Sequence, residues 1–170
     1  MNNQILSSAK EENLFRGVLN RTFQLLARFG PGASSVRVWL HRKRGVKIGA
    51  KVWIGYDTII ETARPNLVSI GNNVAIMMRV TIIAHFRDTK GVRIEDDAFI
   101  GPGAMILPHV TIGRGAVVAA GSVVSSSVPP GMLVQGNPAQ IVAKCSVPLG
   151  WTTPLPVFYR GLQRVRQRGE

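Results

Sequence analysis

Residues 94–128 read IEDDAF IGPGAM ILPHVT IGRGAV VAAGSV VSSSV when they are divided every six residues. An aliphatic residue opens each unit: Ile94, Ile100, Ile106, Ile112, Val118 and Val124. A small or β-branched residue stands two positions before each later one, so a unit holds an in–out–in triplet such as Val110-Thr111-Ile112, the alternation of a short strand. A spacing of six is not a helical period. Strands this short must stack on their neighbours, and the stretch therefore predicts a solenoid.

The same spacing extends toward the N-terminus, with two breaks. Isoleucines recur every six residues over 48–60 and again over 70–82, and the intervening ARPNLV predicts a small loop at one corner. A second break, at residues 85–91, predicts a loop that leaves the coil, and such loops often carry function. Beyond Pro129-Pro130-Gly131, the segment MLVQGNPAQIVAK is expected to form a last partial turn. We expect three parts: an N-terminal helix and basic connector (1–47), the solenoid (48–144) and a tail (145–170).

The flanks of the solenoid are basic. The chain has a net charge of +12, and the Lys and Arg excess lies in the segments before residue 48 and after residue 128. Residues 9–29 have apolar side chains at helical spacing and predict a helix that caps the solenoid or lies on a membrane surface, with residues 33–47 as a connector. A basic flank can meet an anionic membrane or an anionic ligand. Nucleic acid is not expected, because no DNA-binding motif or aromatic platform accompanies the charge.

Targeting and redox signals are few. The N-terminal residues do not resemble a signal peptide, no apolar run approaches the length of a membrane span, and Cys145 is the single cysteine. A cytoplasmic location is therefore expected. The Pro-rich tail, with aromatic residues followed by Arg residues, is expected to pack back on its own or a neighbouring subunit, or to contact a membrane surface.

The hexads, a histidine just before a loop and the ending VVAAGSVVSSSVPPGMLVQGNPAQIVAK together resemble the hexapeptide-repeat acyltransferases, in their sugar and polysaccharide O-acetyltransferase branch. The resemblance implies an all-β fold, a left-handed parallel β-helix with three hexads per coil, usually assembled as a homotrimer. It also implies acetyl-CoA as co-substrate and a sugar hydroxyl as acceptor, in the biosynthesis of a cell-surface polysaccharide or lipopolysaccharide. Two alternatives remain: an acetyltransferase for an amino acid, antibiotic or free sugar, and a β-helix scaffold without catalytic activity.

His85 is the expected catalytic residue. The resemblance places the family's catalytic histidine at this position, and an imidazole is suited to take the proton of an attacking hydroxyl as a general base. His109 is a weaker candidate. It follows His85 by one regular coil plus one hexad, so a regular coil would put the two histidines at different corners. His41 lies in a basic run and is expected to be solvated or next to a phosphate.

The resemblance also carries over the contacts with the two substrates. Coenzyme contacts fall on Pro102, Ala120, Ser125, Ser126, Gln140 and Lys144. The acceptor contact falls on Asp57, for which a turn residue is the alternative, and Arg87 is a weaker candidate near the histidine. No metal is expected, since the three histidines lack the close spacing of a zinc site. Cys145 is expected to be a small apolar residue, with direct transfer in a ternary complex.

Overall fold

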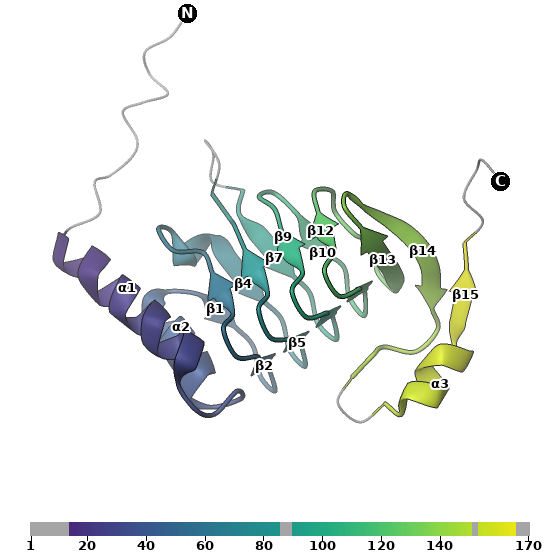
Figure 1. Cartoon of the computed structure of the whole chain (residues 1–170), viewed down its shortest axis with the longest axis horizontal. Coiled ribbons are helices and arrows are strands. Elements are labelled where there is room, and N and C mark those ends of the chain that lie inside the picture. The colour runs from purple at the N-terminus through teal and green to yellow at the C-terminus, as the bar shows by residue number, and fades with distance from the viewer. Residues whose placement is uncertain (1–13, 86–89, 151–152, 166–170) are drawn as a thin grey trace, which may run out of the picture.

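The computed structural model describes residues 14–85, 90–150 and 153–165. They form the expected left-handed parallel β-helix, with two helices at its N-terminal end and a short helix near its C-terminal end (Figure 1). The helices are α1 (Leu14–Phe29), α2 (Val36–Arg44), the 3-10 helix η1 (Pro65–Leu67) and α3 (Leu155–Arg160). Among the described residues, no helix is long and apolar enough to span a bilayer.

Three sheets form the three faces of the solenoid. The first face consists of β1 (Lys47–Ile48), β4 (Val68–Ile70), β7 (Val92–Ile94) and β10 (Thr111–Ile112). The second face consists of β2 (Trp53–Ile54), β5 (Ala75–Ile76), β8 (Phe99–Ile100), β11 (Val117–Val118), β13 (Met132–Gly136), β14 (Ala139–Cys145) and β15 (Leu162–Arg164). The third face consists of β3 (Ile59–Ile60), β6 (Thr81–Ile82), β9 (Met105–Ile106) and β12 (Val123–Val124).

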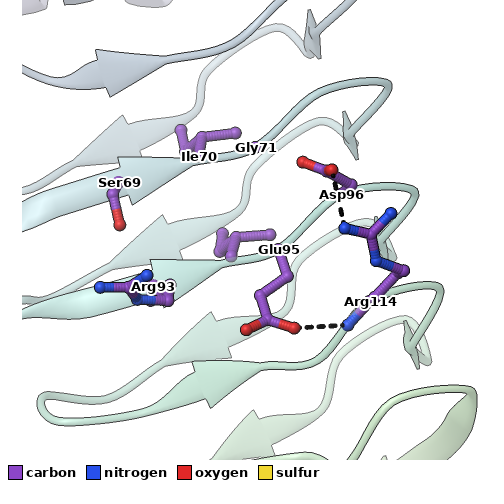
Figure 2. A pocket seen from close by; sticks show the side chains of 8 residues that line it. Ser69, Ile70, Gly71, Arg93, Glu95, Asp96 and Arg114 are labelled. Carbon is purple, nitrogen blue, oxygen red and sulfur yellow. Dashed lines mark hydrogen bonds and ion pairs between the residues drawn. The ribbon is translucent and has the colours of Figure 1, made fainter.

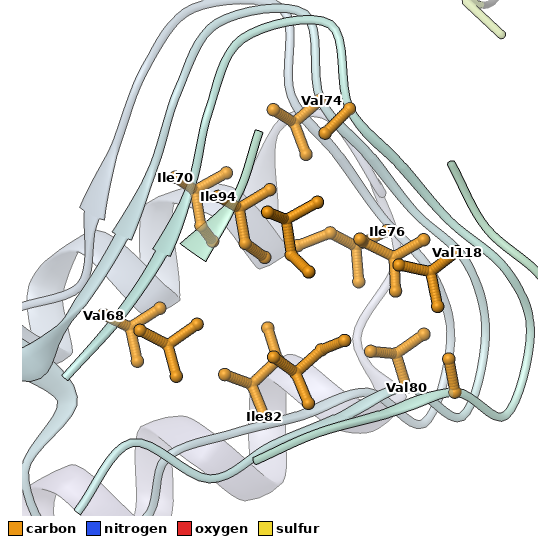
Figure 3. Close-up of a cluster of buried hydrophobic side chains, with 14 of the residues drawn as sticks. Val68, Ile70, Val74, Ile76, Val80, Ile82, Ile94 and Val118 are labelled. Atoms are coloured by element: carbon orange, nitrogen blue, oxygen red, sulfur yellow. The ribbon is translucent and has the colours of Figure 1, made fainter. Parts of the chain in front are cut away.

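The hexad aliphatics form the core. The isoleucine columns that the sequence predicts are in register: Ile54 pairs with Ile76, Ile76 with Ile100, and Ile100 with Val118. Side chains from the three faces point into one narrow triangular interior (Figure 3), and the core isoleucines of the faces are at most 4% exposed. Because the interior is filled by one layer of Ile and Val per coil, the core needs no aromatic residues.

Turns between faces repeat with the same period of six. In these hexads the residue just before the first of the two inward-facing side chains has a positive φ, as in Asp97 (61°), Gly103 (69°), His109 (68°), Gly115 (65°) and Gly121 (67°). Glycine adopts this conformation without steric cost, whereas other residues adopt it less readily. His109 therefore occupies a turn position that the fold itself requires.

Both sequence breaks fall at one corner, between the third face and the first face, which we call the loop corner. The register pairs Ile48 with Ile70 and Ile70 with Ile94, so these two coils are both longer than the regular coil from Ile94 to Ile112. The predicted small loop after Ile60 is confirmed, and it contains η1. The second insertion begins after β6, but its residues 86–89 lie outside the described residues.

The predicted connector over residues 33–47 is wrong in part, because it contains α2. Val38, Leu40, His41 and Arg44 form the buried side of this helix, and the run of basic residues conceals the spacing in the sequence. The prediction for His41 is also wrong: its side chain is fully buried rather than solvated. The predicted helix over 9–29 is confirmed for residues 14–29, and residues 9–13 lie outside the described part.

The C-terminal end closes with reversed strands. The segment predicted as a last partial turn begins as one, since β13 pairs in parallel with β11, but the chain then folds back as β14, antiparallel to β13. The intervening Asn137–Pro138 peptide bond is cis. The tail packs back on its own chain as expected, with β15 beside β14 and Phe158 of α3 buried against Val117 and Cys145. Cys145 is thus a buried apolar residue, and burial raises its pKa.

Candidate functional site

His85 lies at the loop corner, just after the inward-facing Ile82 of β6, and its side chain is 43% exposed. Its ring nitrogen Nδ1 lies 2.8 Å from both carboxylate oxygens of Glu61, which is one coil earlier at the same corner. Glu61 was not predicted as a site residue. Its side chain is only 1% exposed, so the pair joins a buried carboxylate to a solvent-facing imidazole.

Glu61 is held in place by four backbone N–H groups. Oε1 accepts hydrogen bonds from Ala63 (2.8 Å) and Arg64 (3.1 Å), and Oε2 accepts from Ala84 (2.8 Å) and His85 (3.2 Å). Burial alone would raise the pKa of this carboxyl, but the hydrogen bonds from the His85 side chain and from these backbone groups outweigh it and lower the pKa to about 2. Glu61 is therefore a carboxylate, which can only accept hydrogen bonds, at any physiological pH.

The carboxylate fixes the tautomer of His85. Since Glu61 has no proton to donate, Nδ1 of His85 must carry the hydrogen that lies between them. In the neutral ring, Nε2 then bears the lone pair and can act as an acceptor. A carboxylate that orients a histidine in this way is the arrangement found behind the base in catalytic triads. The corner thus presents to solvent an oriented imidazole whose Nε2 can accept a proton.

A buried cation lies behind Glu61. Arg44 of α2 donates to the backbone oxygens of Glu61 (2.5 Å) and Ile60 (2.9 Å), and to the side chains of Asn20 (2.8 Å) and His41 (2.9 Å). Burial lowers the pKa of Arg44 to about 10, against the opposing effect of Glu61, so the guanidinium stays charged. The N-terminal helices are therefore part of the support of the site.

His41 completes this network as a neutral ring. Burial, and then the charge of Arg44, lower its pKa to about 3. Its Nδ1 accepts the hydrogen bond from Arg44, so the proton of the neutral ring is on Nε2. Nε2 is buried without a hydrogen-bond partner among the described residues. His41 is thus a structural acceptor for Arg44.

His109 lies at the same corner as His85, not at a different one. The prediction assumed regular coils, but the coil from Ile82 to Ile106 contains the second insertion, and these two isoleucines pair in register. Both histidines therefore follow paired strands at the loop corner. They differ in their surroundings, because His109 is an exposed turn residue whose backbone N–H donates to the carbonyl of Gly91 (3.0 Å).

The predicted coenzyme residues are all exposed, and four of them lie on either side of the third face. Pro102 and Ala120 occupy neighbouring turns between the second and third faces, where Gly121 N–H donates to Pro102 C=O (2.9 Å). Ser125 and Ser126 follow β12 at the loop corner, two strands beyond β6. Ser125 and Ser126 thus share the His85 corner, and Pro102 and Ala120 do not.

Gln140 and Lys144 lie on β14, outside the parallel coils, where Lys144 is opposite Met132. Asp57 is not brought to His85. It is a turn residue between the second and third faces, with φ of 56°, and it forms an ion pair with Arg28 of α1 at 2.6 Å. Arg87 lies outside the described residues.

A hollow of about 290 Å³ lies elsewhere, on the first face and the turns that follow it (Figure 2). Three of its charged residues are joined: Arg114 contacts Asp96 at 3.1 Å, and the backbone N–H of Arg114 donates to Glu95 at 3.0 Å. His85 is not among the residues that line this hollow. The described residues contain no cluster of three His, Cys, Asp or Glu side chains that could hold a metal ion.

Comparisons with known proteins agree with this architecture. Residues 91–126 match the family model described as bacterial transferase hexapeptide (six repeats). The putative acetyltransferase YvoF of Bacillus subtilis is 36% identical over 124 residues, which is 69% of this chain and 71% of that protein. Serine acetyltransferase of Bacillus licheniformis is 38% identical over 135 residues, 76% of this chain but only 56% of that protein.

A solved structure similar to this chain is also that of an acetyltransferase. The hexapeptide-repeat acetyltransferase VCA0836 of Vibrio cholerae, in complex with acetyl-coenzyme A, superposes with a TM-score of 0.58 and 25% identity. The match covers 80% of this chain and 90% of that one. The shared coils thus extend well beyond the residues that match the family model.

Proposed function

The chain belongs to the hexapeptide-repeat acetyltransferases, and on this premise we propose that it transfers the acetyl group of acetyl-CoA to a sugar hydroxyl with His85 as general base. The observation that carries the proposal is the His85–Glu61 pair, with Nδ1 2.8 Å from the carboxylate and Nε2 left as acceptor. The sugar acceptor is proposed from the resemblance of the hexads and the GNPA ending to the sugar and polysaccharide branch.

Each step of the transfer has a group to perform it. As the hydroxyl oxygen bonds to the thioester carbonyl carbon, its proton moves to Nε2 of His85, and Glu61 stabilises the resulting imidazolium. The carbon–sulfur bond then breaks, and the same proton passes from Nε2 to the departing thiolate. The products are an acetyl ester and a free thiol. Transfer is direct, and Cys145 takes no part in it, since it is buried at the end of β14 against Val117 and Phe158.

We propose that the coenzyme extends along the loop corner from His85 toward Ser125 and Ser126. The spacing of adjacent strands places these serines roughly 10 Å from His85 along the solenoid axis. Pro102 and Ala120, at the other edge of the third face, and Gln140 and Lys144 on β14 are the further proposed contacts. Lys144 is the cation among these residues, and coenzyme phosphates require cations or N–H donors.

The proposed assembly is a homotrimer. One outward-facing valine, Val117, is covered by Phe158 and Cys145 of its own chain. The second, Val123, remains half-buried on the third face. A neighbouring subunit placed against this face would shield the coenzyme from water. Sedimentation velocity of the full chain tests the trimer, and a monomer at micromolar concentration would contradict it.

A hydroxyl of a small molecule such as serine is the second candidate acceptor, because a serine acetyltransferase is among the relatives and matches 76% of this chain. The proposed polysaccharide acceptor, or its lipid-linked precursor, would place the enzyme in the cytoplasm at the inner face of an anionic membrane. A panel of sugars, glycans and hydroxyl amino acids, read by release of the free thiol from acetyl-CoA, separates these acceptors. The His85→Ala variant is the blank, and equal turnover by that variant would contradict the proposed base.

A further inference from the structure

Helix α1 packs with its polar and small residues inward. The buried residues are Gly17, Asn20, Gln24 and Ala27. Asn20 donates to the carbonyl of Thr62 (2.8 Å), and Gln24 donates to that of Thr58 (3.3 Å). A surface helix of a globular protein normally buries its apolar side instead. These hydrogen bonds, together with the Arg28–Asp57 ion pair, fix the rotation of α1 about its own axis.

The outward side of α1 is consequently apolar. At 3.6 residues per turn, one arc of about 140° contains eight exposed residues, seven of them apolar. They are Leu14, Phe15, Val18, Leu19, Leu25, Leu26 and Phe29, between 42% and 80% exposed, together with Thr22. The hydroxyl of Thr22 donates to the carbonyl of Val18 within the helix (2.9 Å). We call this arc the apolar face of α1.

Two amphipathic aromatic residues lie beside the apolar face of α1. Phe23 contacts Trp39 of α2 with ring centroids 6.3 Å apart, and Phe29 contacts Tyr56 at 5.6 Å. Trp39 is 51% exposed and Tyr56 49% exposed. Trp and Tyr are enriched where a membrane meets water, because each has an apolar ring and a polar group.

The border of the face is cationic. Arg16 and Arg21 are exposed on either side of the arc, and Lys43 lies 5.7 Å from the Trp39 ring. Neither α1 nor α2 contains an acidic residue. A second copy of the chain placed on this face would oppose arginine to arginine, whereas anionic lipid headgroups complement the charge. The exposed apolar arc of α1 and the positive charge along its border therefore favour a lipid surface over self-association.

We propose that α1 docks in the plane of an anionic membrane, with its apolar face among the acyl chains and Arg16, Arg21 and Lys43 at the headgroups. Figure 1 shows α1 as the outermost element at the N-terminal end of the solenoid, so no other described element lies between it and such a surface. At 16 residues, α1 lies on the membrane rather than spanning it.

This placement brings the base to the lipid surface. Asn20 contacts Thr62, which is the residue after Glu61, so α1 lies beside the coil that orients His85. One helix diameter plus one strand spacing separates His85 from the surface by roughly 15 Å. A sugar linked to a membrane lipid is within reach of the base at this distance. The docking itself does not depend on the identity of the acceptor.

Cosedimentation of the full chain with vesicles of phosphatidylcholine and phosphatidylglycerol in equal parts tests the proposal. The Leu25→Gln/Leu26→Gln variant keeps the charge and the helix propensity but removes two apolar side chains from the arc. We expect its partition coefficient to fall about tenfold or more. The matched control is Leu155→Gln/Val157→Gln, which changes two exposed residues of α3 at the other end of the molecule and leaves binding unchanged.

A second pair of variants tests the cationic border. Arg16→Gln and Arg21→Gln are each expected to weaken binding about fivefold on the mixed vesicles and to have no effect on phosphatidylcholine alone. Equal melting temperatures and equal acetyl transfer to a water-soluble acceptor show that the variants are folded and active, which separates this proposal from the proposed function. Wild-type protein that does not bind the mixed vesicles would overturn it. So would a larger assembly, seen by mass photometry without lipid, that the Leu25→Gln/Leu26→Gln change dissolves.

Discussion

The first two coils and the last two coils are packed with different kinds of residues. Beyond Ile94 the coils consist of regular hexads, and the buried positions shared by the three faces are almost all aliphatic or Ala. Before Ile94 both coils contain an insertion, and a network of His41, Arg44, Glu61 and Asn20 is buried beside them. The regular coils provide a rigid frame, and the irregular coils provide oriented polar groups.

The largest expected effect separates the two histidines of the loop corner. His85→Ala is expected to lower kcat for acetyl transfer roughly 10²–10⁴-fold, the usual contribution of a general base, without loss of stability at this half-exposed position. His109→Asn is the matched control in the neighbouring coil, since Asn tolerates the positive φ of this turn. Steady-state kinetics of both variants provide the measurement, and comparable losses in the two would contradict the assignment of His85.

Glu61→Gln is expected to lower kcat about 10²-fold while KM for acetyl-CoA stays the same. The amide can donate to Nδ1 of His85, which favours the tautomer with the proton on Nε2 and removes the acceptor. Glu61→Asp, which keeps the charge, is expected to restore part of the activity. A purely structural role for Glu61 would instead change the melting temperature of both variants and leave the kcat of the folded protein intact.

Two variants, Arg44→Met beside the irregular coils and Ile112→Val in a regular coil, compare how much each region contributes to stability. Removing this buried cation leaves Asn20, His41 and two backbone carbonyls without their donor, and we expect a loss of roughly 3–5 kcal/mol in the free energy of unfolding. Ile112→Val, in a regular coil, is expected to cost about 0.5–1.5 kcal/mol. Urea denaturation of both variants gives the comparison, and a smaller loss for Arg44→Met would mean that the network contributes little.

A further expected effect on the irregular coils depends on pH. The pKa of His41 is about 3 in the folded chain and near 6.5 when unfolded, so below pH 6.5 the unfolded state binds the extra proton. Stability from His41 is therefore fully present above pH 6.5 and falls by up to about 1.4 kcal/mol per pH unit as pH decreases toward 3. In His41→Gln this slope is expected to disappear between pH 6.5 and 4.5.

Below that window, Glu61 adds its own slope, because its pKa is lowered to about 2 and the stability it provides is lost as pH falls from about 4.5 toward 2. Urea unfolding measured across the pH range separates the two contributions. Parallel curves for wild type and His41→Gln above pH 4.5 would contradict the assignment to His41.

The sequence predicted the frame well because its cause is local. A hexad specifies its own strand and turn, so the coils, the corner loop after Ile60 and the position of His85 at a break all follow from spacing. Glu61 was missed because its contact with His85 spans a whole coil and depends on where each insertion leaves that coil. The corner of His109 was mispredicted for the same reason.

The N-terminal helices were predicted less well because their burial contradicts hydropathy. The run HRKRG predicts a solvated connector, yet His41 and Arg44 are buried in α2. In α1 the leucines and phenylalanines that predict a buried side point outward. The burial of polar residues in α2 and the exposure of apolar residues in α1 cannot be predicted from spacing alone, since both depend on the polar partners in the first coil.

The reversal of direction at β13–β14 has a consequence for assembly in the cell. A stack of parallel strands has two open ends, and each end could template the coils of another molecule in an unlimited fibre. Here β14 runs antiparallel, and the short β15, which ends at Arg164, forms the outer edge. A coil of a second chain cannot continue the parallel strands of the second face in register, so the hairpin opposes polymerisation at this end of the solenoid.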